Sequence, residues 1–150
     1  WHTRSLPADI PATLGSEDTL FDDVAQTLPY RIRIEVSNRG GTTTGPYQYR
    51  LEYAKKTSTC GEATSWTDVG GAGGDWDMDV TSQLVDGTDT TNIATSTGGL
   101  TNDRTTFLSP NGGQEESTSQ TGNITLTVTQ YVELEYSISA ACYQYDDPSI

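Results

Sequence analysis

The chain has 150 residues, with 21 acidic against 8 basic side chains and a formal net charge of −13. This length fits one ordinary domain. The charge repels nucleic-acid backbones and anionic membranes, and no stretch approaches the length of a membrane-spanning helix. Composition therefore argues against nucleic-acid partners and membrane insertion, and suits a protein that stays soluble outside a cell.

The first 28 residues differ from the rest of the chain. Pro7 and Pro11 punctuate them, and Pro29 follows directly. Such a polar, proline-broken segment has too few apolar residues to fold alone. We expect residues 1–28 to form an extended arm. Its scattered apolar side chains would occupy pockets on a folded surface: Leu6, Ile10, Leu14, Leu20 and Phe21.

Alternating apolar and polar residues predict four strands. The alternation covers residues 30–36, 47–53, 124–128 and 132–138. A Gly/Thr-rich break at 38–46 predicts that the first two strands form a hairpin. The short connection at 129–131 is either a tight turn or a bulge that moves the chain to another sheet.

Weaker signals fill the middle of the chain. Residues 66–69 predict a short strand, 79–85 a single helical turn, and 105–108 another strand. Residues 114–123 are polar and predict a loop. Because no 3.6-residue apolar period is sustained, residues 29–150 are predicted to form an all-β, two-sheet sandwich, Ig-like or jelly-roll-like, of roughly seven to nine strands.

Cys60 and Cys142 are the only cysteines. They lie far apart, outside any CxxC pair and without metal-ligand histidines. We expect one disulfide between them, which would stabilise the fold by roughly 2–4 kcal/mol and implies an oxidising compartment. Two unpaired buried thiols are the alternative. The disulfide predicts a secreted protein, extracellular or at the cell surface.

Residues suited to catalysis are scarce. His2 is the only histidine and lies at the very terminus, so a Ser-His-Asp or Cys-His arrangement lacks a well-placed imidazole. No glycine-rich loop precedes a helix, which removes the scaffold of phosphate and dinucleotide sites. We expect no enzymatic activity and no required cofactor.

One acidic segment approximates a calcium-binding loop. Asp75, Asp77 and Asp79, followed by Asp86, offer hard oxygen ligands at alternate positions. The match is imperfect, because the sixth position lacks glycine and the closing position lacks a bidentate glutamate. The alternative is a strand or turn that buries Trp76 and exposes the carboxylates.

A pattern of short sequence stretches covers about residues 14 to 139. It comprises YRIRIEVSN, YRLEYA, TSTC, SWTDVG, GGDWDMDVTSQLVDGTDTTNIATSTGGL, TTFLSPNGG, TSQTGNITLT and VELEYSI. The pattern resembles a domain of large, secreted, Thr/Gly-rich surface proteins from uncultivated bacteria. That resemblance implies a repeated extracellular β-sandwich and no defined ligand.

The C-terminal end departs from this pattern. Similar domains continue past the VELEYSI-type strand into a further cysteine-bearing strand, whereas this chain reaches Cys142 almost at once. We therefore expect a shortened or missing closing strand. The resulting unpaired edge would accept an extended segment of a neighbour by strand addition.

These features predict a structural subunit that self-associates into a homopolymeric fibre or surface assembly. The arm of one copy would complete a neighbouring copy, and an arm folded back on its own domain is the alternative. A second candidate function is a calcium-dependent carbohydrate-binding or adhesin module, in which Trp66 and Trp76 stack on a glycan.

Overall fold

The computed structural model describes residues 2–5, 17, 24–26, 28–55, 63–93 and 99–141. This part of the chain forms strands and no helix, and thus no helix that is long and apolar enough to cross a membrane. The strands are β1 (His2–Ser5), β2 (Pro29–Ser37), β3 (Glu52–Tyr53), β4 (Thr67–Asp68), β5 (Trp76–Met78), β6 (Thr106–Phe107), β7 (Gln114–Glu115) and β8 (Gln130–Ala140). The predicted all-β sandwich is confirmed.

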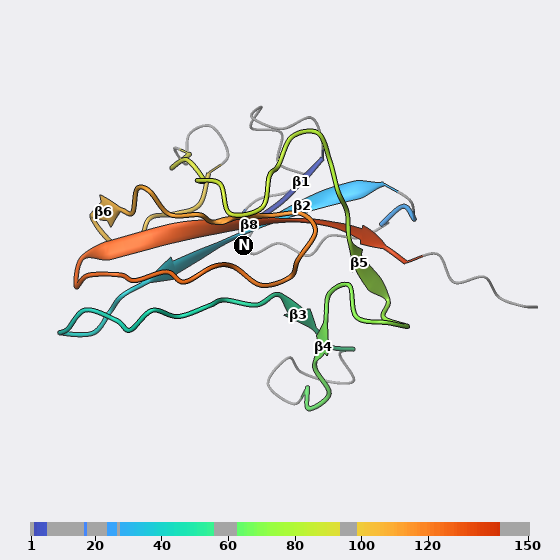
Figure 1. Cartoon of the computed structure of the whole chain (residues 1–150), viewed down its shortest axis with the longest axis horizontal. Helices are drawn as coiled ribbons and strands as arrows, with labels where there is room; N and C mark the ends of the chain where they lie inside the picture. The colour runs from blue at the N-terminus through green and yellow to red at the C-terminus, as the bar shows by residue number, and fades with distance from the viewer. Residues whose placement is uncertain are drawn as a thin grey trace, which may run out of the picture.

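Two long strands, β2 and β8, form the centre of the first sheet (Figure 1). They pair antiparallel along the whole of β2, from Pro29 opposite Ser139 to Ser37 opposite Tyr131. β1 pairs with the other edge of β2. Three short strands share the second edge of β8: β6 and β7 run parallel to it, and β5 runs antiparallel at its end.

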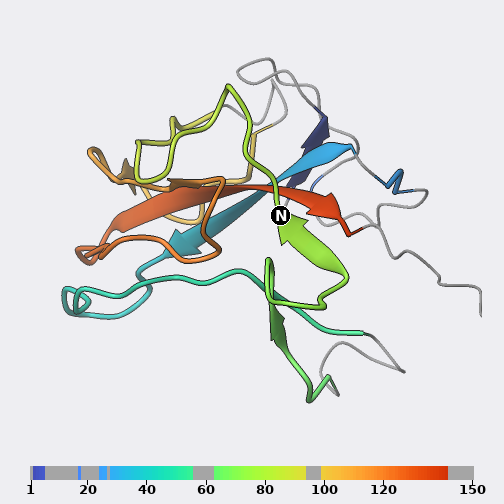
Figure 2. The ribbon, with the colours of Figure 1, turned by 45° about the vertical axis from the view of Figure 1, so that its right-hand side comes forward.

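A second layer faces this sheet (Figure 2). β3 and β4 pair antiparallel in it. The segment before β3 runs beside residues 119–126, and Tyr47 and Ile124 exchange backbone hydrogen bonds of 3.0 and 2.8 Å. The layer therefore consists of extended chain with few regular ladder positions.

The hydrophobic core lies between the two layers. One face of β8 supplies a row of buried apolar side chains, and the register places the apolar row of β2 directly beside it. The second layer contributes four buried residues from the opposite side: Leu51, Val69, Ile124 and Leu126. Tyr136 crosses the core and donates its hydroxyl to the carbonyl oxygen of Tyr49 at 3.2 Å.

The predicted hairpin between residues 30–36 and 47–53 is wrong. The two segments lie in different layers, with their apolar residues on opposite sides of one core. Asn38 diverts the chain, because its side-chain amide donates to the carbonyl oxygens of Thr42 and Leu126 at 2.8 and 3.0 Å. Two apolar rows can thus face each other across a core as readily as they can lie side by side.

The connection before β8 moves the chain between layers. Residues 44–47 bond to Leu126 and Ile124 in the second layer, while β8 begins at Gln130 in the first. A turn at residues 128–129 separates them. Each of the two sequence alternatives is therefore correct in part: the connection is a turn, as in the first, and it moves the chain to the other layer, as in the second.

In the middle of the chain, the structure agrees with some of the predicted elements and differs from others. The short strands expected at 66–69 and 105–108 appear as β4 and β6. No helical turn forms at residues 79–85, because the Thr81 hydroxyl accepts the N–H groups of Gln83 and Leu84 at 3.2 and 3.3 Å. The predicted loop at 114–123 is wrong at its start, where β7 forms.

Candidate assembly edge

The outer edge of β2 is covered along part of its length. β1 pairs with residues 30–33 and ends with His2 opposite Arg33. Asn38 donates its N–H toward β8, to the carbonyl oxygen of Gln130 at 3.0 Å. Because backbone groups alternate in direction along a strand, Glu35 and Ser37 direct their N–H and C=O groups away from β8. Among the described residues, no strand pairs with that end of the edge.

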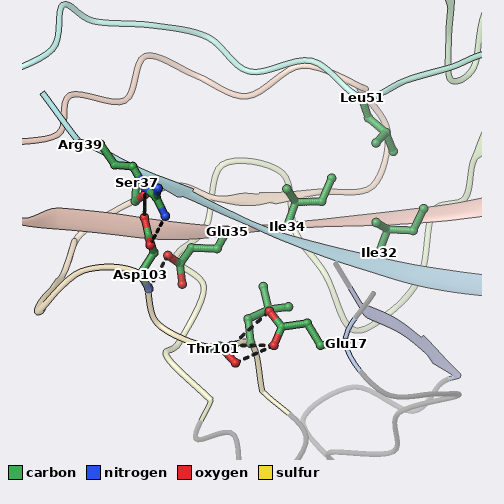
Figure 3. A pocket seen from close by; sticks show the side chains of 10 residues that line it. Glu17, Ile32, Ile34, Glu35, Ser37, Arg39, Leu51, Thr101 and Asp103 are labelled. Carbon is green, nitrogen blue, oxygen red and sulfur yellow. Dashed lines mark hydrogen bonds and ion pairs between the residues drawn. The ribbon is translucent and has the colours of Figure 1, made fainter. Parts of the chain in front are cut away.

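A groove of about 600 Å³ runs beside this end of β2 (Figure 3). Its apolar lining comes from both layers: Ile32, Ile34, Leu51 and Leu100. Its polar lining is Glu17, Glu35, Ser37, Arg39, Thr101 and Asp103. An apolar floor beside outward-facing backbone groups is the combination that accepts an extended peptide by strand addition.

Asp103 fastens the loop of residues 99–104 to the end of β2. Its carboxylate accepts hydrogen bonds from Ser37 Oγ at 2.5 Å and from Arg39 Nε at 2.6 Å. The bond from Arg39, followed by that from Ser37, lowers the pKa of Asp103 to about 2. The carboxylate therefore stays charged, and one wall of the groove is fixed in place.

Glu35 is the incompletely bonded group of this groove. Its Oε1 accepts the N–H of Asp103 at 2.9 Å, while its Oε2 is buried without a hydrogen-bond partner. Burial raises the pKa of Glu35. A carboxylate oxygen in such a position gains free energy from any added donor. Nearby, Glu17 accepts the Thr101 hydroxyl at 2.7 Å, so the rim is mainly acidic.

A buried charge cluster, which was not predicted from the sequence, lies on the face of β2 and β8 that points away from the core. Arg31, Arg33, Glu133 and Glu135 are each at most 3% exposed. Arg33 Nη2 lies 2.7 Å from Glu135 Oε2, and its Nη1 bonds to Glu133 and to the Thr91 carbonyl oxygen. Alternation alone predicts that these residues face solvent, and only their opposite charges hint at pairing.

Irregular chain covers this charged face. The Thr90 hydroxyl donates to the Glu133 carbonyl oxygen at 2.6 Å. Two segments of this irregular chain, around Thr90 and around Asn111, are joined by the Asn111 side chain. Its Oδ1 accepts the N–H groups of Thr90 and Gly113, each at 2.9 Å. Its Nδ2 donates to the Thr90 carbonyl oxygen at 3.0 Å. The sheet therefore has buried residues on both faces.

The four aspartates of the predicted calcium loop have separate surroundings. Asp75 lies 3.2 Å from Lys55 Nζ, and Asp77 is exposed on β5. Asp86 accepts the N–H groups of Glu116 and Ser117 at 2.6 and 3.0 Å. No three His, Cys, Asp or Glu side chains of the described part form a group suited to a metal ion. Calcium binding by Asp75, Asp77, Asp79 and Asp86 stays a prediction.

Other sequence-predicted residues fall outside the described part. Neither Cys60 nor Cys142 belongs to it, so their disulfide stays a prediction. The same holds for the anchoring residues proposed for the arm: Leu6, Ile10, Leu14, Leu20 and Phe21. Of the two tryptophans considered for glycan stacking, Trp76 packs against the core while Trp66 is 56% exposed.

Glu115 and Asp86 form a carboxyl pair that links β7 to the loop before it. Glu115 is 2% exposed, lies opposite Tyr136 and shares a hydrogen bond with Asp86. Burial, followed by the charge of Asp86, raises the pKa of Glu115 to about 7. Hydrogen bonds to Glu116 and Ser117 lower the pKa of Asp86 despite its partial burial. The proton of the pair therefore resides on Glu115, which donates to Asp86.

This pair predicts a pH-dependent stability. An acid with a raised pKa in the folded state stabilises the fold fully below its unfolded pKa, near 4.5, and that contribution is lost as pH rises through about 7. Glu35 acts in the same direction. We expect the melting temperature to fall between pH 5 and pH 8. Glu115→Gln, which keeps a donor to Asp86, should raise the melting temperature at pH 8 and flatten the profile.

Glu115→Ala is the matched variant for this measurement. It also removes the titrating group, but it leaves a cavity and takes the donor away from Asp86, so its profile should be flat and low. A melting-temperature slope in Glu115→Gln equal to that of the unmodified protein would contradict the assignment of the proton to Glu115.

Comparison with known proteins gives no family for this chain. No family model matches the sequence. Neither the curated proteins nor the solved structures contain a significant match.

Proposed function

We propose that this chain is a secreted, non-enzymatic structural subunit that self-associates into a fibre or surface assembly by strand addition. The observation that supports this most directly is the edge of β2. It carries a strand from the N-terminal arm along residues 30–33, and beyond Arg33 it offers outward-facing backbone groups beside a groove. The family resemblance to repeated extracellular domains agrees with this role.

Exchange between copies is favoured by the way β1 is connected. Residues 6–28 separate β1 from β2 in sequence, and at about 3.3 Å per extended residue they are long enough to reach a neighbouring domain. Exchange of an identical element between copies of one chain is the general route of domain swapping. A four-residue edge strand also opens at low cost in free energy.

The carbohydrate-binding alternative has less support. It needs an aromatic platform and an organised acidic loop, but Trp76 is partly buried in the core and the aspartates lie in separate surroundings. Of the two tryptophans in the described part of the chain, Trp66 alone has an exposed indole, at 56%. A single exposed ring is common on protein surfaces. Strand addition therefore explains more of the molecule.

Deletion of residues 1–28 tests the proposal. We expect native protein to form polymers in negative-stain electron microscopy and the truncated protein to remain monomeric in light scattering. The truncated protein should also melt at a lower temperature, because the edge of β2 loses its partner strand. A synthetic peptide of residues 1–28 should restore that temperature.

Two outcomes would contradict the proposal. Monomeric native protein over a wide concentration range would remove self-association. Polymers of the truncated protein would show that assembly uses other surfaces, such as lateral faces or the segment after residue 140. A peptide with the same composition in scrambled order is the control for the restoration experiment.

A further inference from the structure

The register of β1 within one chain sets basic residues opposite basic residues. His2 lies opposite Arg33, and Arg4 lies opposite Arg31. Residues directly opposite in an antiparallel pair share one face, with Cβ atoms about 4.5–5.5 Å apart, and like charges there destabilise the pair. This register therefore sets basic residues of the arm opposite two arginines that already have Glu133 and Glu135 as partners.

The other half of the same edge offers the opposite charge. Glu35 directs its backbone outward, and its side-chain Oε2 is buried without a hydrogen-bond partner. Glu35 is the carboxylate that β2 itself offers to the groove, since Asp103 is already bonded to Arg39 and Glu17 belongs to the arm. By contrast, the segment His2–Ser5 contains no acidic residue. The groove and the arm are thus complementary in charge.

We propose that, in the assembly, the arm of a second copy pairs antiparallel with β2 four residues further along, with Arg4 opposite Glu35 and His2 opposite Ser37. This inference rests on the proposed function and names its acceptor site and register. The added strand bonds to the outward backbone groups of Glu35 and Ser37 and covers the groove. Since each copy in a polymer gives its own arm away, the whole edge of β2 is open to the incoming strand.

Other registers fit less well. A shift by an odd number of residues turns every side chain of the strand to the opposite face. A shift by two places Arg4 opposite Arg33, which is again a cation, and a shift by six places it opposite the neutral Ser37. Only the shift by four brings Arg4 to a carboxylate. It also gives the buried Oε2 of Glu35 a charged donor.

A charge exchange tests this register. Arg4→Glu and Glu35→Lys should each abolish polymers in electron microscopy, because each sets like charges together, and the double variant should restore them. Asp77→Lys makes the same change of charge at an exposed position of β5, at the far edge of the sheet, and should assemble normally. Circular dichroism of each variant checks that the domain is folded.

Disulfide trapping gives an independent readout. A mixture of Arg4→Cys and Glu35→Cys proteins should form covalent heterodimers on a non-reducing gel, in far higher yield than a mixture of Arg4→Cys and Arg31→Cys. Heterodimers through position 31 would overturn the register, and so would a double charge variant that fails to assemble while folded. If either result is obtained while polymers of the native protein still depend on the arm, the register is wrong but the proposed function stands. Polymers that still form after deletion of residues 1–28 would contradict both the register and the proposed function.

Discussion

Replacement of Arg33 by methionine is expected to unfold the domain or to lower its urea midpoint severely. The side chain is 3% exposed and bonds to Glu133, Glu135 and the Thr91 carbonyl oxygen. Without it, two carboxylates remain buried near each other, and breaking a buried pair in this way costs about 3–5 kcal/mol. A typical domain has only about 5–15 kcal/mol of total stability.

A surface variant provides the comparison. Arg39 also forms an ion pair, with Asp103, but it is 72% exposed. Because solvent screens exposed pairs and they contribute little to stability, Arg39→Met should barely move the urea midpoint. Equal midpoints for the two variants would show that the cluster around Arg33 is hydrated and not buried. Arg31 also pairs with Glu135, at 2.9 Å. A quadruple variant that replaces Arg31, Arg33, Glu133 and Glu135 by apolar residues should therefore recover much of the loss, since the charges then disappear together.

The sequence predicts the two central strands well for a physical reason. Residues 30–36 and 132–138 alternate strictly, and a strand with one face against the core requires that alternation. The same pattern misleads about the other face. Alternation marks arginines and glutamates as solvent-facing, yet Arg33 and Glu133 are buried, and irregular chain at Thr90 and Thr91 bonds to both of them.

Pairing partners are harder to read than strands. Residues 47–53 alternate as well, but periodicity does not say whether two apolar rows lie side by side or face to face. Asn38 determines that they lie face to face, because its side chain donates hydrogen bonds to Thr42 and Leu126. These two acceptors lie far apart in sequence. β7 was missed because it consists of two residues, one of them the buried Glu115.

The candidate site depends on these long-range relations. Proline spacing predicts an extended arm, whereas the expectation of an open edge was implied only by the resemblance to surface-protein domains. The location of the groove does not follow from the sequence, because residues distant in sequence line it, such as Ile34, Leu51 and Leu100. Glu35 looks like an ordinary exposed residue until the fold places Asp103 against it.

Gly113→Ala is expected to destabilise the domain by about 1–3 kcal/mol, as overpacking of a close-packed interior does. An added Cβ would lie 2.8 Å from the Glu133 carbonyl oxygen and 3.1 Å from Asn111 Oδ1. Neither atom can retreat easily. The carbonyl belongs to the central strand β8, and the Asn111 side chain is held by five hydrogen bonds within the irregular chain that covers the charged face.

The backbone at this position is equally constrained. Gly113 accepts the N–H of Glu135 at 2.8 Å, so a shift that relieves the clash breaks a ladder bond of β8. We therefore expect faster hydrogen exchange at the Glu135 amide in addition to a lower urea midpoint. Gly122→Ala is the matched control, because nothing lies within 4 Å of its added Cβ, and it should leave the midpoint unchanged or raise it slightly. Equal midpoints for the two variants would mean that the cover over the charged face yields to the methyl group, and the buried state of Arg33 and Glu133 would then need another cause.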